Sequence, residues 1–256
     1  MDPIWAVSAG LVPYDEARRV QHAIAGARQA GEIPDVLLLL EHPPVYTKGK
    51  RASAEELPMG EDWYRMRGIE VTDTDRGGWT TYHGPGQLVA YPIVSLRPYG
   101  DDVGAYVRTM ERVMIAALRV WGVETQVIDG LAGVWTLGAA PLEPGAIGPQ
   151  GTPVGPASPG EGMARKIGSI GIHIDRGVTT HGLAINVNND LQPFEWIVPC
   201  RIDAVRMTSL TRELGAEQDL GAFAQTLVEQ WCEHYEREPV VRSLDDVLRP
   251  LALKTA

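Results

Sequence analysis

Two consecutive segments in the second half of the chain alternate large apolar residues with small or polar ones. Residues 166–175, KIGSIGIHID, place isoleucine at every second position from Ile170, and residues 182–187, GLAINV, repeat the period of two. A turn sequence, Arg176-Gly177, lies between the two segments. This pattern is typical of strands, and the intervening turn predicts that they pair antiparallel. A β-sheet must therefore form part of the core.

Three other segments repeat every 3.6 residues and predict helices over residues 15–30, 101–122 and 220–235. Residues 36–40 form a continuous apolar run, which is typical of a buried strand, and residues 134–137 predict a further short strand. Helices towards both ends of the chain, with strands between them, predict an α+β layered fold.

The composition excludes several classes of protein. The chain has 256 residues, of which 44% are hydrophobic and 22% charged, and we expect residues 1–256 to form a single globular domain. A net charge of −10 disfavours nucleic-acid binding, which needs clustered lysine and arginine. No apolar run reaches the ~18 residues of a membrane span, and we see no signal peptide. With two cysteines, Cys200 and Cys232, the chain is expected to be cytoplasmic with reduced thiols.

One segment has no periodicity. Between Gly138 and Gly162, 13 of 25 residues are glycine or proline. Such a composition buries too little apolar surface to order itself, and it predicts a flexible surface insertion. The alternative is a lid over a neighbouring site.

The segment richest in chemical information is RGGWTTYHGPGQLVAYPI, residues 76–93. Its glycines allow a ligand to approach the backbone closely, Arg76 could bind an anionic or carbonyl oxygen, and His83 precedes a tight turn. Together they predict a binding segment, and the alternative is an ordinary hairpin with a capping histidine. The chain contains neither a dinucleotide fingerprint nor a phosphate-binding loop.

Lys166 and Cys200 form a second candidate pair. Lys166 begins an apolar strand, where an ammonium is costly unless another group uses it. Cys200 follows a proline after an apolar run, and a thiol near an ammonium is activated as the thiolate. Cys232 instead fits an inert residue on a helix. His173 and His181 lack a third ligand at metal-binding spacing, and we expect no metal site.

Five segments occur in the order and approximate spacing of a known family. They are EHPPVYTKGK, RGGWTTYHGPGQLVAYPI, KIGSIGIHI, THGLAINVNNDL and IVPC. Over roughly residues 36–210 the chain resembles the octanoyltransferases of lipoate biosynthesis. The resemblance implies a biotin/lipoate ligase-like α+β fold with a mixed sheet and flanking helices.

The resemblance also implies an activity and a site. The activity is transfer of an octanoyl group from acyl carrier protein to a lysine of lipoyl domains, in 2-oxoacid dehydrogenases and in the glycine cleavage H protein. Cys200 would carry the acyl group as a thioester and Lys166 would lower the pKa of its thiol, without metal or cofactor. The implied acyl pocket comprises Arg76, Gly77, Gly78, Trp79, Thr80, Thr81, Tyr82, His83, Ser169, Ile170, Gly171, Gly182, Leu183 and Ala184. The chain departs from the family in having Arg201 where glycine is usual, and in the length of the 138–162 insertion.

Two alternatives remain open. An ATP-dependent lipoate–protein ligase on the same fold would need no cysteine, and a non-catalytic module would bind lipoyl domains or acyl carriers without forming an acyl-enzyme. Both protein partners of the expected reaction are generally acidic, as is this chain, so docking needs a local basic patch. The candidates for that patch are Lys48, Lys50, Arg51, Arg65 and Arg67.

Overall fold

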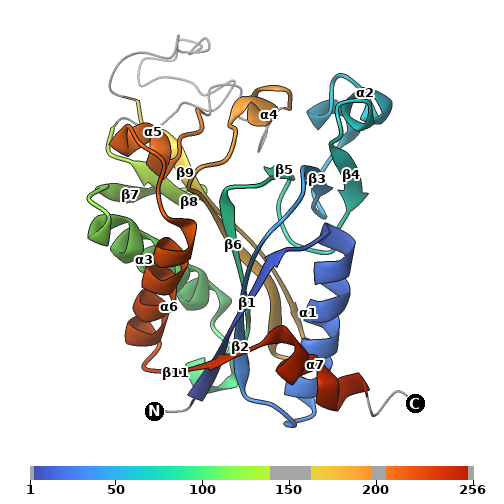
Figure 1. The fold of residues 1–256 in the computed structure, drawn as a ribbon, viewed down its shortest axis with the longest axis vertical. Helices are drawn as coiled ribbons and strands as arrows, with labels where there is room; N and C mark the ends of the chain where they lie inside the picture. The colour runs from blue at the N-terminus through green and yellow to red at the C-terminus, as the bar shows by residue number, and fades with distance from the viewer. Residues whose placement is uncertain (1–2, 139–162, 198–205, 253–256) are drawn as a thin grey trace.

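The computed structural model describes residues 3–138, 163–197 and 206–252 (Figure 1). Cys200, Arg201 and nearly all of the 138–162 segment lie outside the described residues. What we expect of them therefore remains a prediction.

The described chain forms two sheets. The larger has eight strands in the order β11-β1-β2-β6-β10-β9-β8-β7, and the smaller has the order β4-β3-β5. In the large sheet β1 pairs parallel with β2 and β11, whereas the other pairs are antiparallel, so the predicted mixed sheet is confirmed. The strands are β1 (Pro3–Leu11), β2 (Asp35–Glu41), β3 (Val45–Lys48), β4 (Glu70–Asp73), β5 (Thr80–His83), β6 (Gln87–Ile93), β7 (Thr125–Ile128), β8 (Leu131–Thr136), β9 (Lys166–Asp175), β10 (Val178–Asn186) and β11 (Glu238–Arg242).

Helices cover both faces of the large sheet. One core lies under α3 and α6, and a second lies under α1 and α7, which Figure 1 shows on opposite sides of the strands. Along β2, Leu37 and Leu39 enter the first core whereas Leu38 and Leu40 enter the second. This is why the run 36–40 is continuously apolar. The helices are α1 (Tyr14–Gln29), α2 (Glu61–Arg65), α3 (Val103–Val120), α4 (Gln192–Glu195), α5 (Leu210–Leu214), α6 (Leu220–His234) and α7 (Leu244–Ala252), with 3-10 turns at Ala54–Glu56 and Arg97–Tyr99.

The periodic patterns predicted the main elements. β9 and β10 pair antiparallel around Arg176 and Gly177, which both adopt left-handed φ angles, of 48° and 77°. The second predicted helix is α3, whose N-cap Asp102 accepts a hydrogen bond from the backbone N–H of Ala105. In the described part of the chain, no helix combines the length and the apolar character needed to cross a membrane.

Residues 76–93 do not form a hairpin, and that alternative is wrong. β5 pairs with β3 in the small sheet, whereas β6 lies between β2 and β10 in the large one. Gly84-Pro85-Gly86 is the crossing point between the two sheets. Gly86 has a φ of 83°, and a Cβ there would lie 2.8 Å from backbone atoms of Asn188 and Asn189. Only glycine fits this crossing.

In the part of the chain that the structure describes, the far edge of β9 pairs with a neighbouring strand only at its start. β8 pairs with β9 at Lys166 and Gly168. Further along, the backbone N–H of Gly77 donates to the carbonyl of Ile172 at 2.9 Å, so a loop occupies the position that a strand would take. Within the described residues, this leaves a gap between β8 and the loop, and the cavity described below opens there.

Candidate active site

A cavity of about 780 Å³ lies against β9 and β10. Lys166 and every residue of the expected acyl pocket except Tyr82 line it. Tyr82 packs instead against Tyr46 and Phe194, and burial raises its pKa to about 12. The lining also includes residues that the sequence analysis did not single out as pocket residues: Tyr14, Arg51, Val89, Tyr91, Val107, Gly130, Leu131, Ala132, Trp135, Ile172 and His181.

Lys166 is fixed at the start of β9 through its backbone. Its N–H donates to the carbonyl of Arg206 at 2.8 Å, and its carbonyl accepts from the N–H of Thr208 at 2.9 Å. The side chain is 8% exposed, with Nζ 5.3 Å from the centroid of the Trp135 ring. The chain that carries Cys200 thus re-enters the described structure beside Lys166.

Gly133 makes room for the lysine side chain. It has a φ of 109°, and a Cβ at this position would lie 2.9 Å from Lys166 Cε and 2.3 Å from the carbonyl oxygen of Gly168. Any side chain here would therefore push against both the lysine and the backbone of β9. The other thiol of the chain, that of Cys232, is buried in α6, and burial raises its pKa to about 11, which fits the inert role expected of it.

One wall of the cavity is the loop Asp75–Gly78. The Arg76 guanidinium donates to the carbonyl and hydroxyl oxygens of Thr47 at 2.6 and 2.7 Å, and to the carbonyl of Gly77 at 3.0 Å. The oxygens that these donors bind belong to the protein itself, so the expected contact of Arg76 with a ligand oxygen remains a prediction. Its donors hold the loop against β3.

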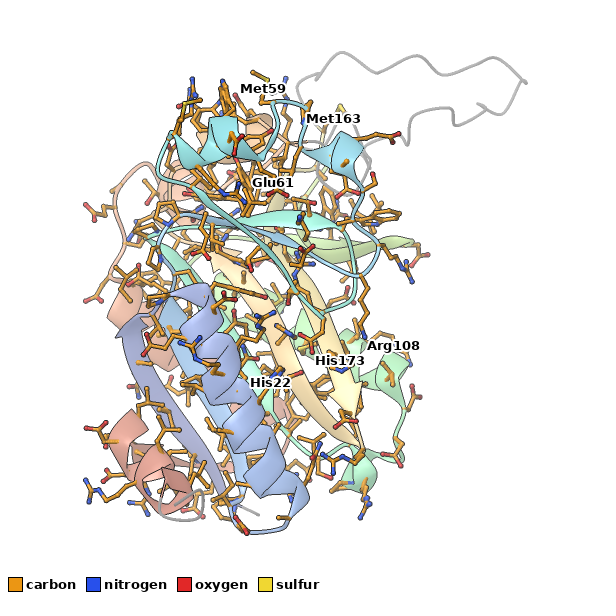
Figure 2. All side chains as sticks on the ribbon, turned by 90° about the vertical axis from the view of Figure 1, so that its right-hand side faces the viewer. His22, Met59, Glu61, Arg108, Met163 and His173 are labelled. Carbon is orange, nitrogen blue, oxygen red and sulfur yellow. The ribbon has the colours of Figure 1, made fainter. Side chains whose placement is uncertain are left out.

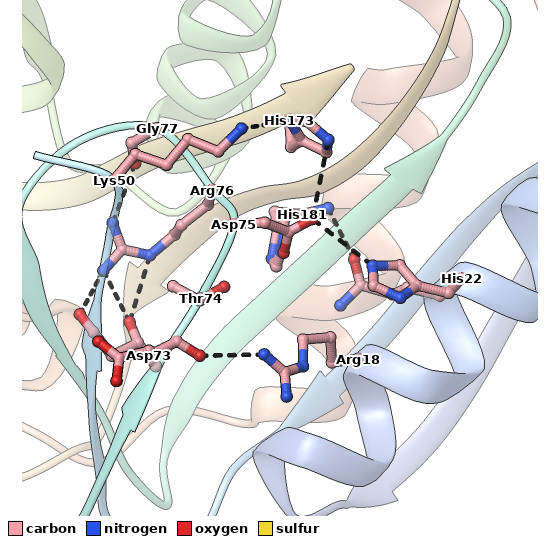
Figure 3. A network of polar contacts seen from close by, with 12 residues as sticks. Arg18, His22, Lys50, Asp73, Thr74, Asp75, Arg76, Gly77, His173 and His181 are labelled. Carbon is pink, nitrogen blue, oxygen red and sulfur yellow. Dashed lines mark hydrogen bonds and ion pairs between the residues drawn. The ribbon is translucent and has the colours of Figure 1, made fainter. Parts of the chain in front are cut away.

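Asp75 anchors the same loop on its other side, and the sequence analysis missed it (Figure 3). His181 Nε2 lies 2.9 Å from Asp75 Oδ1. This hydrogen bond holds the pKa of the Asp75 carboxyl well below its usual range. His22 and His173 lie 3.6 and 3.8 Å from Asp75 Oδ2, on the face seen in Figure 2. No group of three or more described histidine, cysteine or acidic residues has an arrangement that could hold a metal ion.

His181 adopts a left-handed φ of 57° although it lies within β10. Its backbone N–H donates to Gln21 Oε1 of α1 at 2.6 Å, away from the neighbouring strands. A left-handed histidine is strained, and such strain persists only where the surroundings impose it. Here it turns the imidazole towards Asp75 and Tyr14.

Five aromatic residues form what we call the buried polar cluster: Tyr14, His42, His83, Tyr91 and His181. Neighbouring rings lie 5.1 to 6.5 Å apart, and all except His42 line the cavity. Burial lowers the pKa of His42 to about 4, and lowers the pKa of His83 well below its ordinary value. Burial raises the pKa of Tyr91 well above its ordinary value. Burial also lowers the pKa of His181. The three histidines and Tyr91 are therefore neutral at pH 7.

A family model described as the lipoyl protein ligase A/B catalytic domain matches residues 13–232. The octanoyltransferase of Roseiflexus sp. (strain RS-1) is 41% identical over 233 residues, covering 91% of this chain and 87% of that protein. The octanoyltransferase of Rubrobacter xylanophilus is 42% identical over 221 residues, covering 86% of this chain and 87% of that protein. The chain therefore belongs to the lipoyl protein ligase A/B family, and more particularly to its octanoyltransferases.

The fold agrees with this assignment. A bipartite lipoate protein ligase from Thermoplasma acidophilum superposes with a TM-score of 0.70 at 17% identity, covering 99% of this chain and 92% of that one. The lipoate ligase-like α+β fold implied by the sequence motifs is confirmed. The individual roles given to Cys200, Lys166 and the pocket residues remain predictions.

Proposed function

We propose that this chain moves an octanoyl group from acyl carrier protein to a lysine of a lipoyl domain, through a thioester on Cys200. The observation that carries the proposal is the attachment of Lys166. Its N–H and its carbonyl both form hydrogen bonds with the segment 206–208. That segment directly follows residues 198–205, which include Cys200 and lie outside the described structure. The chain therefore returns to Lys166, at the cavity wall, shortly after the candidate nucleophile.

The first half-reaction is thiol–thioester exchange. Lys166 as an ammonium favours the Cys200 thiolate, which attacks the thioester carbonyl carbon. Backbone N–H groups of the glycine-rich wall hold the oxyanion. The bond to the carrier sulfur breaks, and the carrier thiolate takes a proton from Lys166 Nζ, which leaves Lys166 as a neutral amine. The octanoyl group is now bound to Cys200.

The second half-reaction is aminolysis. The neutral amine of the acceptor lysine attacks the same carbonyl carbon, and the bond to the Cys200 sulfur breaks. The neutral Lys166 amine takes a proton from the attacking nitrogen and delivers it to the sulfur, so a free thiol and an amide result. Atoms and charges balance without a metal or a redox cofactor.

The cavity suits an acyl chain. Apolar side chains of β8, β9 and β10 line part of it, among them Leu131, Ile170 and Leu183, next to glycines that add no side chain to the wall. Apolar lining combined with polar groups that orient the ligand is the usual form of a small-molecule site. The thiol mechanism requires a reducing compartment, so we expect the enzyme to work in the cytoplasm.

The structure shows that some residues of the basic patch expected to dock the carrier are already paired with acidic residues. Lys48 is paired with Glu61 and Asp73, at 2.7 and 3.4 Å. Arg65 is likewise paired with acidic residues of α2. Arg51, by contrast, lines the cavity, and Lys50 contacts His173 at 3.3 Å. Arg67 stacks on the ring of Trp63, with its guanidinium carbon 3.3 Å from the ring centroid. We therefore narrow the docking patch to Lys50 and Arg51.

The decisive experiment is mass spectrometry of the intact chain after incubation with an octanoyl thioester and no acceptor. We expect one octanoyl mass on Cys200, removable by hydroxylamine and absent from Cys200→Ala. Cys232→Ser is the matched control and should still be acylated. Transfer that proceeds with Cys200 unmodified, or that requires ATP and magnesium, would refute the thioester route and favour the ligase alternative. Pocket binding without any transfer would favour the non-catalytic module.

A further inference from the structure

Hydrogen bonds within the protein fix the tautomers of two histidines in the buried polar cluster. His42 Nδ1 lies 2.7 Å from the carbonyl of Val12, which can only accept, so Nδ1 carries the proton. Its Nε2 then accepts from the hydroxyl of Tyr91 at 2.7 Å. His181 donates from Nε2 to the ionised Asp75, so its lone pair is at Nδ1 and faces Tyr14. The His42 ring is thus hydrogen-bonded on both sides, whereas His181 Nδ1 lies 3.4 Å from the hydroxyl of Tyr14, which donates its own proton to Thr74 Oγ1 at 2.9 Å.

A chain of amides fixes the tautomer of His83. Asn186 Nδ2 donates to the carbonyl of Thr208 at 3.0 Å, so Asn186 Oδ1 is an acceptor. Gln87 Nε2 donates to that Oδ1 at 2.9 Å and to the carbonyl of Tyr82 at 3.3 Å. Gln87 Oε1 is therefore the group facing His83 Nδ1 at 2.6 Å. An amide oxygen only accepts, so Nδ1 of His83 is protonated and Nε2 carries the lone pair.

The lone pair of His83 is left for a ligand. Within the described residues Nε2 has no hydrogen-bond partner, although the residue is only 7% exposed and lines the cavity. An acceptor at the cavity wall that no described protein group occupies is available to a bound ligand, and such polar groups orient ligands in small-molecule sites. The ligand group must be a donor, because Nε2 can only accept.

The same amide chain connects His83 with Lys166. It passes from His83 through Gln87 and Asn186 to the carbonyl of Thr208, and the N–H of Thr208 donates to the carbonyl of Lys166 at 2.9 Å. Both ends of this chain line one cavity. The position of the His83 lone pair is therefore coupled to the backbone that places Lys166.

We propose that His83 Nε2 accepts a hydrogen bond from the incoming amine of the acceptor lysine and orients it for attack on the acyl-enzyme, with Gln87 and Asn186 as positioning residues. An octanoyl chain has no N–H or O–H group, whereas the acceptor is a primary amine. The amine nitrogen keeps its own lone pair for the carbonyl carbon, while one of its N–H bonds points at His83. This inference rests on the proposed thioester mechanism and concerns only its second half.

The test separates the two half-reactions. Acyl-enzyme formation is measured as the octanoyl mass that the chain gains from an octanoyl thioester. Aminolysis is measured under single-turnover conditions as the loss of that mass when a purified lipoyl domain is added. We expect His83→Gln to form the acyl-enzyme at close to the wild-type rate and to lose on the order of 10²-fold in the aminolysis rate, as misorientation of a reactant costs. His234→Gln, on the outer surface of α6, is the matched control and should change neither rate.

Gln87→Glu provides a readout that packing alone would not move. A carboxylate facing Nδ1–H stabilises the imidazolium, which removes the lone pair at Nε2. The acid limb of aminolysis should therefore move to higher pH, while the acid limb of acyl-enzyme formation stays in place. An unchanged limb in a folded Gln87→Glu protein would overturn the proposal.

Four further outcomes are decisive. Loss confined to acyl-enzyme formation in His83→Gln would assign the donor to the carrier side and refute the inference. Equal loss in both halves would show an effect that is not specific to the acceptor amine, and would also refute it. Nitrogen chemical shifts of the wild-type protein that give His83 the Nε2–H tautomer would refute it even if the variants do not fold. A wild-type chain that never becomes acylated would instead refute the thioester mechanism itself.

Discussion

Two parts of the cavity wall are built in different ways. Lys166 is placed by backbone hydrogen bonds on both of its sides and by the space that Gly133 leaves. The buried polar cluster is held by hydrogen bonds between side chains and by burial that keeps its histidines neutral. The wall at Lys166 is therefore sensitive to backbone shape, whereas the polar cluster is sensitive to protonation.

The largest effect is expected at the lysine itself. Lys166→Ala should reduce turnover by about 10³-fold, because it removes both the cation that favours the thiolate and the proton carrier. Alkylation of Cys200 by iodoacetamide should move to higher pH in the folded variant. If the pH profile of alkylation is unchanged, Lys166 does not lower the pKa of the Cys200 thiol, and its role is limited to proton transfer during aminolysis.

A change in backbone shape should disable the same part of the wall without replacing the lysine. Gly133→Ala should lower activity at least tenfold and stability by about 1–3 kcal/mol, since the new methyl strains a left-handed φ and meets Lys166 Cε. Gly130→Ala is the matched control, because Gly130 also lines the cavity with a φ of 81° but a Cβ there meets nothing within 4 Å. Steady-state kinetics and urea unfolding measure both effects. Equal losses in the two variants would show that φ strain alone matters.

The polar cluster should respond to acid instead. His42 has a folded-state pKa of about 4 against 6.5 when unfolded, so the unfolded chain binds the extra proton first as pH falls. The free energy of unfolding should drop by about 3 kcal/mol from this group between pH 6.5 and 4. His42→Gln should flatten that part of the profile in urea titrations. A variant with the same slope as the wild type would contradict the assignment.

The smallest effect is expected at the cavity rim. Reversing Lys50 and Arg51 to glutamate should raise KM for carrier-bound substrate a few-fold, and more than for a small thioester, with the difference shrinking as salt shortens the Debye length. Lys48→Glu is the control, because Lys48 is already paired with Glu61 and Asp73. A larger effect at Lys48 than at Lys50 and Arg51 would contradict this narrowing and favour the wider basic patch predicted from the sequence.

Sequence patterns predicted the parts of this protein that depend on local chemistry. The period of two gave β9 and β10, the period of 3.6 gave α1, α3 and α6, and long motifs identified the family. The separation of β5 from β6 was missed, because a glycine-rich turn between strands has the same local appearance whether the strands pair or part. Only the pairing of each strand with a distant partner decides between the two.

The hydrogen bonds between distant side chains at the cavity could not be predicted from the sequence either. Gln87 and Asn186 are 99 residues apart, and Asp75 and His181 are 106 apart, so their contacts depend on the register of the sheet. Asp75 did carry one signal, since it directly precedes the Arg76 motif. His181 stands beside the predicted Gly182–Ala184 segment, but nothing in its residue type predicts the left-handed backbone that turns it towards the cavity.

The hydrogen bond from Gly77 to Ile172 has a consequence for the behaviour of the molecule in concentrated solution. A strand whose edge is open can recruit a strand from another molecule and start aggregation. By occupying a pairing position on β9, the loop that forms the cavity wall also blocks that edge. Substitutions that release the loop should therefore harm more than ligand binding, because they expose a surface on which identical chains can add to the sheet.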